Sequence, residues 1–530
     1  LLYKQIMKIN KLFLAFVFTM FTSLVFSQEK GLDERINEAF TPFADWWGGL
    51  ILHSFPGSKL ITGSDIPTII ILLVGGALFF TIYFGFINIR YFPISINTVR
   101  GKYDFLESSK KKVNDEGEVS HFQALATAVS GTVGNGNIAG VALAIAIGGP
   151  GATFWMILCG ILGMSTKFVE CTLGVKYRDI GNNGTVYGGP MYYLSKGLQE
   201  KGFLKLGKFL AVVFALLCVG ASFGGGNAAQ SNQAAMQLVS SFGMTGGNAR
   251  TIIGLIMMFV VGIIIIGGIK RIASVTEKIV PFMALMYVFA CLFIILSNIT
   301  YVDDAFGMIF SQAFDPSAGV GGIIGVLITG FRRAAFSNEA GAGSASIAHS
   351  AVKTNFSASE GLVALLEPFI DTVVICTMTA LVIIIFNGDN TVFNYGGEGG
   401  IVVINGLEVE GAAITAAAFS KYISFSGPFL TLAVVLFAIS TMISWSYYGL
   451  QSWMYLFGKS KISGLIYKLI FLMFIVIGAA ADMSSVWGFS DAMILALVFP
   501  NMLGLLILYP KVKQELSKYL NAIKSSNSNL

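Results

Sequence analysis

Long apolar runs separated by short polar or charged connections dominate this chain from residue 66 onward. At ~1.5 Å per helical residue, most of these runs can cross a hydrocarbon core of ~30 Å. The pattern predicts an all-α polytopic membrane protein with about eleven transmembrane helices. The predicted spans are residues 66–89, 120–147, 151–176, 208–238, 249–268, 275–298, 318–345, 358–386, 428–456, 463–483 and 486–509.

Two of these predicted spans are interrupted by glycine and polar residues. Ser130–Gly140, with the sequence SGTVGNGNIAG, lies between two apolar half-helices in the second span. Its glycines disfavour a continuous helix, and unpaired backbone groups at membrane depth are tolerated only inside protein or against a cavity or ligand. The sequence RRAAFSNEAGAGSAS interrupts the seventh span after Phe331. We interpret the first break as a candidate binding site, with a glycine-rich packing face as the alternative.

The positions of the two interrupted spans indicate an internal symmetry. The second and seventh spans are five apart, and because five is odd, two five-helix halves would insert with opposite orientations. Inverted-repeat transporters have this arrangement, with sites at their broken helices. The halves are residues 120–300 and 301–510, and residues 66–119 supply one extra N-terminal helix and a cytoplasmic loop. No residue-level repeat is evident, so this prediction rests on topology alone.

Lysine and arginine residues gather in alternate connections between the spans. They include Arg90, Lys176 and Lys270, and the positive-inside rule makes these connections and the tail, residues 511–530, cytoplasmic. An odd number of spans then places the N-terminus outside the membrane. The opposite connection, Asn387–Gly411, is acidic and is interpreted as an extracellular cap or a plain loop.

The N-terminus has the layout of a secretory signal. Two lysines precede a short apolar stretch, so residues 1–27 are predicted to be a signal peptide, with residues 1–6 as an extension before Met7. An uncleaved first span is the alternative. Residues 28–65 are predicted to be an extracellular or interfacial segment, because their two adjacent tryptophans favour the headgroup level.

Composition agrees with a membrane protein. Hydrophobic residues make up 55% of the chain, charged residues 12%, and the mean hydropathy is +0.74, which is far from the composition of soluble domains. The net charge of +5 lies beside the spans, so it indicates topology and does not favour nucleic-acid binding. The five cysteines lie in apolar runs and are predicted to be small buried hydrophobes.

Catalytic and metal motifs are absent from the sequence. His53, His121 and His349 are isolated and near predicted membrane boundaries, which favours neither a metal site nor a histidine relay. No HExxH motif and no phosphate-binding loop occurs. A membrane enzyme and an ATP-driven pump are therefore unsupported.

Backbone groups at the first break are suited to both an amino acid and a cation. Half-helix N-termini expose N–H groups that suit a carboxylate, and terminal carbonyls suit a small hard cation. The residues predicted to lie nearest the ligand are Gly134, Asn135, Gly136 and Asn137. Thr132 is a candidate hydroxyl ligand for the cation.

Polar side chains in two further spans are candidates for substrate binding. Asn227 and Gln230 are spaced i, i+3 in the fourth span and share a helical face. Their amides bond either to substrate or to neighbouring helices. Ser337 and Asn338 lie in the second break, where the membrane interior should be.

Hydroxyls in the ninth span form a candidate ion site. Ser440, Thr441 and Ser444 share a helical face, with Trp445 close by. Together with a carbonyl from the first break, these hydroxyls would give the all-oxygen shell that Na⁺ needs. Hydroxyls that bond back to the i−4 carbonyl of their own helix are the alternative.

Ionisable residues inside spans are costly without a partner and are functional candidates by default. Lys167 and Glu170 are spaced i, i+3 and are predicted to form a structural pair. The coupling or ion-pair candidates at the second break and in the eighth span are Arg332, Arg333, Glu339, Glu367 and Asp371. We predict arginine–acid pairs between these two spans. A protonatable carboxylate that couples transport to H⁺ is the alternative.

Three stretches together resemble the alanine or glycine:cation symporter family. They are GGPGATFWMILCGILGMST, which is Gly148–Thr166, NGNIAGVALAIAIGGPGA and FRRAAFSNEAGAGSASIAH, and the resemblance covers roughly residues 66–509. It implies a leucine-transporter-type 5+5 inverted repeat with an extra N-terminal helix. Members are carriers, not enzymes, and take up small neutral amino acids with Na⁺ or sometimes H⁺.

The resemblance also implies roles for residues of the two candidate sites. The substrate carboxylate would meet the break around Gly134–Asn137, and Trp445 would help to wall a pocket sized for alanine or glycine. Na⁺ would lie between the first break and the pair Ser440 and Thr441. Asn135 departs from the family's pattern, in which GTGN is more usual than GNGN.

The sequence therefore predicts an Na⁺-coupled symporter of alanine or glycine in a bacterial inner membrane, working by alternating access. Its partners would be the amino acid, Na⁺ as the coupling ion, and the lipid bilayer. An H⁺-coupled carrier is the rival within this class. A channel, or a sensor that binds an amino acid without moving it, is the rival outside it.

Overall fold

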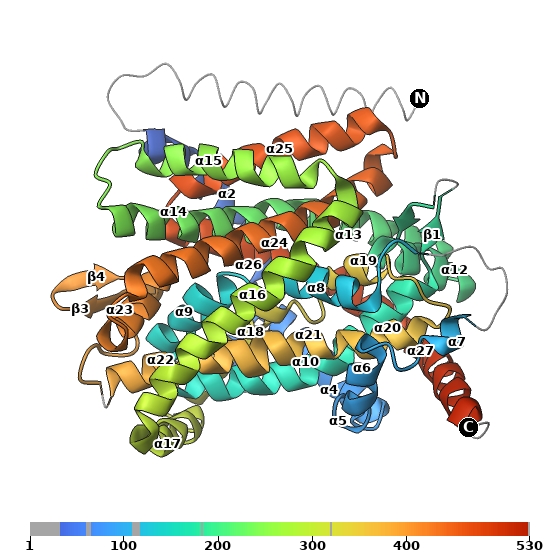
Figure 1. Cartoon of the computed structure of the whole chain (residues 1–530), viewed down its shortest axis with the longest axis horizontal. Helices are drawn as coiled ribbons and strands as arrows, with labels where there is room; N and C mark the ends of the chain where they lie inside the picture. Colours follow the sequence, from blue (N-terminus) through green and yellow to red (C-terminus); the bar gives the residue numbers. More distant parts are fainter. Residues whose placement is uncertain are drawn as a thin grey trace.

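The computed structural model describes residues 32–59, 65–108, 117–181, 184–317, 321–388 and 390–527. The predicted signal peptide, residues 1–27, and its extension, residues 1–6, lie outside this part. The described part is almost entirely helical, with two antiparallel two-stranded ribbons. Figure 1 shows the long helices packed side by side as one bundle.

In the described part, seven helical stretches are long and apolar enough to cross a membrane, and one bent pair of helices makes an eighth. The seven are Gly151–Lys176 (α10), Leu204–Phe242 (α13 and α14), Gly268–Ser297 (α16), Ser357–Asn387 (α20 to α22), Ser426–Phe457 (α24), Lys461–Ala480 (α25) and Met483–Ser526 (α26 and most of α27). The bent pair is His121–Thr132 (α8) and Gly136–Gly148, which is a π-helical turn followed by α9. The chain is thus an all-α multi-pass membrane protein, as predicted.

Three predicted spans are shorter than a full membrane crossing. These segments are α4 (Thr68–Tyr83), α15 (Ala249–Ile265), and α18 (Gly322–Asn338) with its continuation α19 (Ala345–His349). They match the predicted first, fifth and seventh spans. They account for the difference between the eight full spans of the described residues and the predicted count of about eleven.

Individual helices divide the longer stretches, and short helices connect them. The divided stretches contain α9 (Val141–Gly148), α13 (Leu204–Phe223), α14 (Ala229–Phe242), α20 (Ser357–Ala364), α21 (Leu366–Pro368), α22 (Thr377–Asn387), α26 (Met483–Ala496) and α27 (Val498–Asn527). The connecting helices are α2 (Leu32–Ile51), α5 (Ile87–Arg90), α6 (Phe92–Val99), α7 (Phe105–Ser108), α11 (Pro190–Tyr192), α12 (Leu198–Glu200), α17 (Val302–Ala313) and α23 (Ala412–Tyr422). The ribbons pair Asp179–Ile180 (β1) with Val186–Tyr187 (β2) and Val402–Ile404 (β3) with Leu407–Val409 (β4).

The spans divide into central and peripheral helices. The apolar window of α24 is 72% buried inside the protein, whereas that of α16 is only 33% buried. The outer face of α16 carries exposed phenylalanines, among them Phe282, Phe289 and Phe293. Exposed apolar side chains on a membrane span are the surface that lipid tails cover, so α24 belongs to the core and α16 to the lipid boundary.

Both predicted helix breaks are present. After α8, Val133 has a ψ of 94° and leaves helical geometry, and the second half begins at Gly136 at an angle of 52° to the first. After α18, the chain turns through Glu339, Gly341 and Gly343, whose φ values are 55°, 95° and 83°. Left-handed conformations cannot continue an α-helix, so the second break is fixed by backbone geometry.

Two further spans contain π-helical turns. They are Gly224–Ala228 (η3), between α13 and α14, and Phe369–Cys376 (η5), between α21 and α22. At Gly226, an added Cβ would lie 2.2 Å from Cγ of Trp445 on α24. This glycine therefore allows a close approach between the fourth span and the core helix α24. Single π-helical turns inside α-helices are frequent at functional sites.

The N-terminal helix α2 packs on the outside of the bundle against α26. The rings of Phe40 and Phe489 lie 5.2 Å apart edge to face, and the hydroxyls of Thr41 and Ser485 are 2.7 Å apart. α2 is not among the apolar spans. Its assignment to an extracellular or interfacial segment remains a prediction.

The segment between α22 and α23, interpreted from sequence as a cap or a loop, covers one end of α9. Backbone N–H groups of Gly396 and Gly397 donate to the Ala146 carbonyl at 2.7 and 3.2 Å. The β3–β4 ribbon follows, and on α23 the Thr415 hydroxyl donates to the Ile138 carbonyl at 3.2 Å. The segment therefore acts as a cap over the second half of the first broken helix.

We expect Gly226→Ala to destabilise the protein, because its Cβ meets ring and Cβ atoms of Trp445 that cannot move without shifting α24. Overpacking of this kind costs ~1–3 kcal/mol. The thermal unfolding midpoint of the purified protein should fall. Gly488→Ala is the matched control, because an added Cβ there meets nothing within 4 Å. Equal midpoints for the two variants would contradict the close packing of Gly226 against Trp445.

Candidate functional site

The first break is held open by the side chain of Asn137. Its Oδ1 accepts the Gly134 N–H at 2.8 Å, and its own backbone N–H donates to the Gly134 carbonyl at 3.0 Å. An N–H group that would be orphaned where α8 ends thus finds a side-chain partner. Asn137 shapes the break and does not simply point into a ligand space.

Asn137 also connects the first break to the second. Its Nδ2 donates to Oδ1 of Asp371 at 2.7 Å, and Oδ2 of Asp371 accepts from the hydroxyls of Ser337 at 2.8 Å and Thr372 at 2.7 Å. Asp371 lies in η5 and is fully buried. Two of these hydrogen bonds, from Asn137 and Ser337, therefore join both broken helices to one carboxylate, whereas Thr372 lies in η5 beside Asp371.

Asn135 and Gln230 form the next layer of the site. The Asn135 N–H donates to Gln230 Oε1 at 2.9 Å, and Asn135 Nδ2 donates to the Gln230 carbonyl at 3.2 Å. Oδ1 of Asn135 is buried and has no hydrogen-bond partner among the described residues. A buried acceptor without a donor costs ~1–3 kcal/mol, so this oxygen is the atom at the break best placed to receive a ligand's N–H.

Bulky side chains crowd the break closely. A Cβ added at Gly134 would lie 2.4 Å from Thr441 Oγ1, and one added at Gly136 would lie 3.3 Å from the Phe336 ring. The rings of Phe336 and Trp487 are 4.9 Å apart. A side chain at Gly134 would therefore displace Thr441, so glycine is required where the backbone passes α24.

Trp445 points from α24 toward the second break. Its Nε1 donates to Glu339 Oε1 at 2.8 Å, and the second oxygen of Glu339 accepts from the Ser344 hydroxyl. Trp445 is 1% exposed, and the indole packs against Gly226 of the fourth span. The structure thus brings Trp445 and Glu339 together, a contact that the sequence did not predict.

Oxygen atoms from α8 and α24 gather on the other side of the break. Thr441 Oγ1 lies 3.4 Å from the Val133 carbonyl, and the Ser130 hydroxyl donates to the Ser440 carbonyl at 2.8 Å. The hydroxyls of Ser440 and Thr132 donate to carbonyls of their own helices. The lone pairs of these hydroxyl oxygens can therefore coordinate a cation. Hard oxygen donors of this kind suit Na⁺. In the described residues no cluster of three or more His, Cys, Asp or Glu could hold a metal.

Asn227 and Asn338 serve neighbouring protein groups. Asn227 Nδ2 donates to the Phe471 carbonyl on α25 at 2.6 Å. Asn338 Nδ2 donates to Thr372 Oγ1 at 2.9 Å, and its Oδ1 accepts the Ala340 N–H at 3.0 Å. Of the two fourth-span amides, only that of Gln230 is bonded to the first break in the described structure.

The predicted pair of Lys167 and Glu170 is wrong. Lys167 Nζ donates to Glu367 Oε1 at 2.9 Å, with both side chains fully buried. Glu170 Oε1 instead accepts from the Gly341 N–H at 2.9 Å and from Asn501 Nδ2 at 2.8 Å. Helix packing brings Glu367 closer to the Lys167 ammonium than Glu170 is. Glu170 instead bonds to residues at the second break and on α27.

The predicted pairs between the arginines and the acids Glu339, Glu367 and Asp371 are also wrong. Both Arg332 and Arg333 contact Asp491 on α26, Arg332 at 2.8 Å. The arginines precede the end of α18 and face α26, whereas the three acids lie beyond the break or on another span. Asp491 is an acid inside the eleventh predicted span, and the cost of such a charge could have identified it from sequence.

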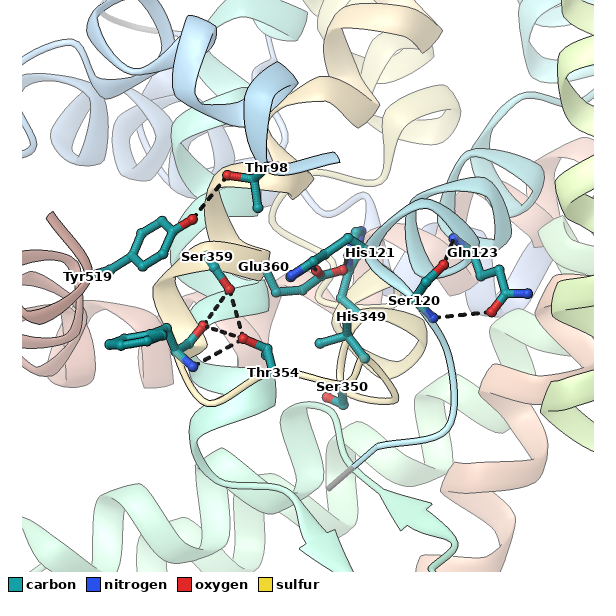
Figure 2. Close-up of polar contacts among 12 residues, drawn as sticks. Thr98, Ser120, His121, Gln123, His349, Ser350, Thr354, Ser359, Glu360 and Tyr519 are labelled. Atoms are coloured by element: carbon teal, nitrogen blue, oxygen red, sulfur yellow. Dashed lines mark hydrogen bonds and ion pairs between the residues drawn. The ribbon is translucent and has the colours of Figure 1, made fainter. Parts of the chain in front are cut away.

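The interpretation of the three histidines as isolated is wrong for two of them. His121 Nδ1 contacts Glu360 Oε2, and His349 Nδ1 lies 2.5 Å from Glu360 Oε1. Figure 2 shows Glu360 between the two rings. His121 and His349 are 228 positions apart, so only the packing of α8 against α19 and α20 reveals the cluster.

Several features define the class of this protein as a membrane carrier: the multi-pass helical fold, the two broken helices and the small polar site at the first break. The model of the sodium:alanine symporter family matches residues 56–529. This chain belongs to that family. Its members and relatives identify it as a carrier and not an enzyme.

The curated relatives cover most of this chain. Sodium/alanine symporter AgcS of Methanococcus maripaludis is 40% identical over 464 residues, which are 87% of this chain and 96% of that protein. Probable sodium/glutamine symporter GlnT of Bacillus subtilis is 34% identical over 86% of this chain and 88% of its own length. Amino-acid carrier protein AlsT of the same organism is 34% identical over 86% and 90%.

Among solved structures, MhsT in complex with L-phenylalanine is similar to this chain with a TM-score of 0.48 and 15% identity. The matched region covers 75% of this chain and 99% of MhsT. A manganese transporter from Eremococcus coleocola gives a TM-score of 0.45 at 14% identity, over 75% of this chain and 78% of that one.

We expect Asn137→Ala to lower the thermal unfolding midpoint by several degrees. The change leaves the Gly134 N–H and one oxygen of Asp371 buried without their partners, at ~1–3 kcal/mol for each group. Asn298→Ala is the matched control, because the Asn298 amide donates to a carbonyl of its own helix at the edge of the bundle. A midpoint equal to that of this control would contradict the role of Asn137 in holding the break.

Proposed function

We propose that this protein is an Na⁺-coupled symporter of a small neutral amino acid, alanine or glycine, and that it works by alternating access. The observation that carries the proposal is the first break itself. A buried unpaired oxygen on Asn135 and the glycine backbone of the interrupted span meet the oxygens of α24 there. Family membership supports sodium coupling and an amino-acid cargo.

The substrate is proposed to lie against Gly134–Asn137. Asn135 Oδ1 would accept a hydrogen bond from the ammonium group, and the N-terminal end of the π-helical turn at Gly136 would attract the carboxylate. Phe336 and Trp445 would limit the side chain, because both rings lie close to glycines of the surrounding helices. This favours alanine or glycine over larger amino acids.

Na⁺ is proposed to lie between the Val133 carbonyl and the pair Ser440 and Thr441, with Thr132 nearby. The ion would then hold α24 against the same break that receives the amino acid. Each ligand would raise the affinity of the other by an equal factor, because both stabilise one geometry of the break. Coupling follows from this shared element.

The proposed location is the inner membrane, with the N-terminus outside and the C-terminal tail in the cytoplasm. Lysine and arginine in alternate connections carry this orientation. Leu143 follows Asn137 by six residues in the second half of the broken span. Gly400 of the cap packs on Leu143, so this half-helix connects the site to the cap. The acidic segment before α23 would then close the site on the extracellular side.

Uptake of labelled alanine into proteoliposomes tests the function. We expect accumulation with an inward Na⁺ gradient and none with K⁺ in its place at fixed pH. Glycine should compete, and glutamine, the cargo in the name of one relative, should compete weakly because of its length. Equal accumulation in both salts would contradict Na⁺ coupling and favour an H⁺-coupled carrier. No accumulation in either salt would overturn the proposal.

The double variant Ser440→Ala with Thr441→Ala tests the ion site. We expect the Na⁺ concentration for half-maximal uptake to rise about tenfold, as the loss of ~1.4 kcal/mol of ion binding predicts. Ser446→Ala is the matched control, because its hydroxyl lies on the same helix and donates to the Ile443 carbonyl. An unchanged Na⁺ dependence in the double variant would contradict this site.

A further inference from the structure

Three helix ends meet at one buried carboxylate on the predicted cytoplasmic side. Glu360 on α20 is fully buried, and its two oxygens contact Nδ1 of His121 and Nδ1 of His349 (Figure 2). His121 is the first residue of α8 and His349 is the last residue of α19. Glu360 therefore ties together one half of each broken span.

The charges continue from this carboxylate into the protein. His349 Nε2 lies 3.5 Å from Glu367 Oε2, and Glu367 Oε1 accepts from Lys167 at 2.9 Å. Because an ionised carboxylate only accepts, each imidazole must present its Nδ1 hydrogen to Glu360. With His349 as imidazolium, the four inner groups Glu360, His349, Glu367 and Lys167 sum to zero charge.

His121 is the outer member of this chain and borders water. It lines a pocket of about 390 Å³ together with Asp104, Glu118 and Lys353. Its side chain is 10% exposed, whereas those of Glu360 and His349 are 0% exposed. Protons from the pocket can therefore reach His121 first.

Two other acids near the pocket, Glu118 and Glu277, have partners of their own. Glu118 Oε1 accepts the Val186 N–H at 2.7 Å, and burial raises the pKa of Glu118 although Val186 and Lys270 act against that rise. On α16, Glu277 accepts from Gln123 at 2.8 Å. Glu360 is the acid that faces the His121 ring directly.

Backbone contacts close the same end of the protein. The Glu118 N–H donates to the Ala351 carbonyl at 2.7 Å, and the Lys353 N–H donates to the Val119 carbonyl at 2.8 Å. Arg178 Nη1 donates to the carbonyls of Ser350 at 2.8 Å and Val352 at 2.5 Å. Separation of α8 from α19 requires the backbone bonds of Glu118 and Lys353 and the Glu360 contacts to break together, while Arg178 holds the residues after α19 to the end of α10.

We propose that His121, Glu360 and His349 form a proton-binding latch on the cytoplasmic end, in which protonation of His121 tightens its bond to Glu360 and slows opening toward the cytoplasm. The inference rests on the proposed function, because it assumes that this end opens to release the amino acid. A charge-assisted hydrogen bond is roughly twice as strong as a neutral one, so the charged imidazole holds α8 more firmly. Histidine is the side chain whose charge most readily changes within the pH range of a cell's interior.

Alanine efflux from right-side-out membrane vesicles tests the latch, with the internal pH set and the external pH fixed. For the wild type we expect efflux to be about fivefold slower at an internal pH near 6 than near 8. His121→Gln keeps a donor for Glu360 but cannot titrate, so its efflux should not depend on internal pH. A pH dependence in His121→Gln equal to that of the wild type would overturn the proposal.

His53→Gln is the matched control, since His53 is the third histidine and is exposed. It should keep the wild-type response to internal pH. Loss of the response in His53→Gln as well would assign it to another part of the protein and overturn the latch.

A readout without transport separates this proposal from the proposed function. Ser346→Cys places a thiol in the fully buried turn of α19, where a membrane-permeant maleimide reacts only after opening. We expect labelling near pH 6 to be slower with His121 than in the His121→Gln background, and equal near pH 8. Equal labelling in both backgrounds at both pH values would overturn the latch, whereas vesicles that move no alanine would overturn only the proposed function.

Discussion

The structure depends most on the buried carboxylate of Asp371, which holds both interrupted helices at once. One oxygen receives the amide of Asn137 from the first break and the other receives the hydroxyl of Ser337 from the second. A carboxylate in the membrane interior is stable only with such partners, and broken helices are stable there only when their free backbone groups are satisfied. Each feature therefore makes the other possible: the breaks supply the donors, and the acid fixes the angle at which the half-helices meet.

From this arrangement the two proposed ligand sites share one piece of backbone. Val133 contributes its carbonyl toward Thr441 on one side of the break, while Asn135 leaves an unpaired oxygen on the other. A change in the angle between α8 and the following half-helix alters both sides together. Under the proposed function, coupling between an ion and an amino acid would need no long pathway through the protein, because both would bind the same piece of backbone.

The fold and the breaks could be predicted from sequence because they depend on local chemistry. Apolar runs, the glycines of SGTVGNGNIAG and the hydroxyl face of Ser440 and Thr441 act within one helix. The ionic partners could not be predicted in this way. Desolvation requires Lys167 and Arg333 to find acids, but the choice of Glu367 and Asp491 depends on which helices pack together. The contact of two distant histidines with Glu360 has the same origin.

In the proposed function, the ion and the amino acid bind to one shared break. The most direct measurement is isothermal titration of the purified protein with alanine at several Na⁺ concentrations, and with Na⁺ at several alanine concentrations. We expect Na⁺ to raise the alanine affinity and alanine to raise the Na⁺ affinity by the same factor. An alanine affinity that is identical in Na⁺ and in K⁺ would contradict it.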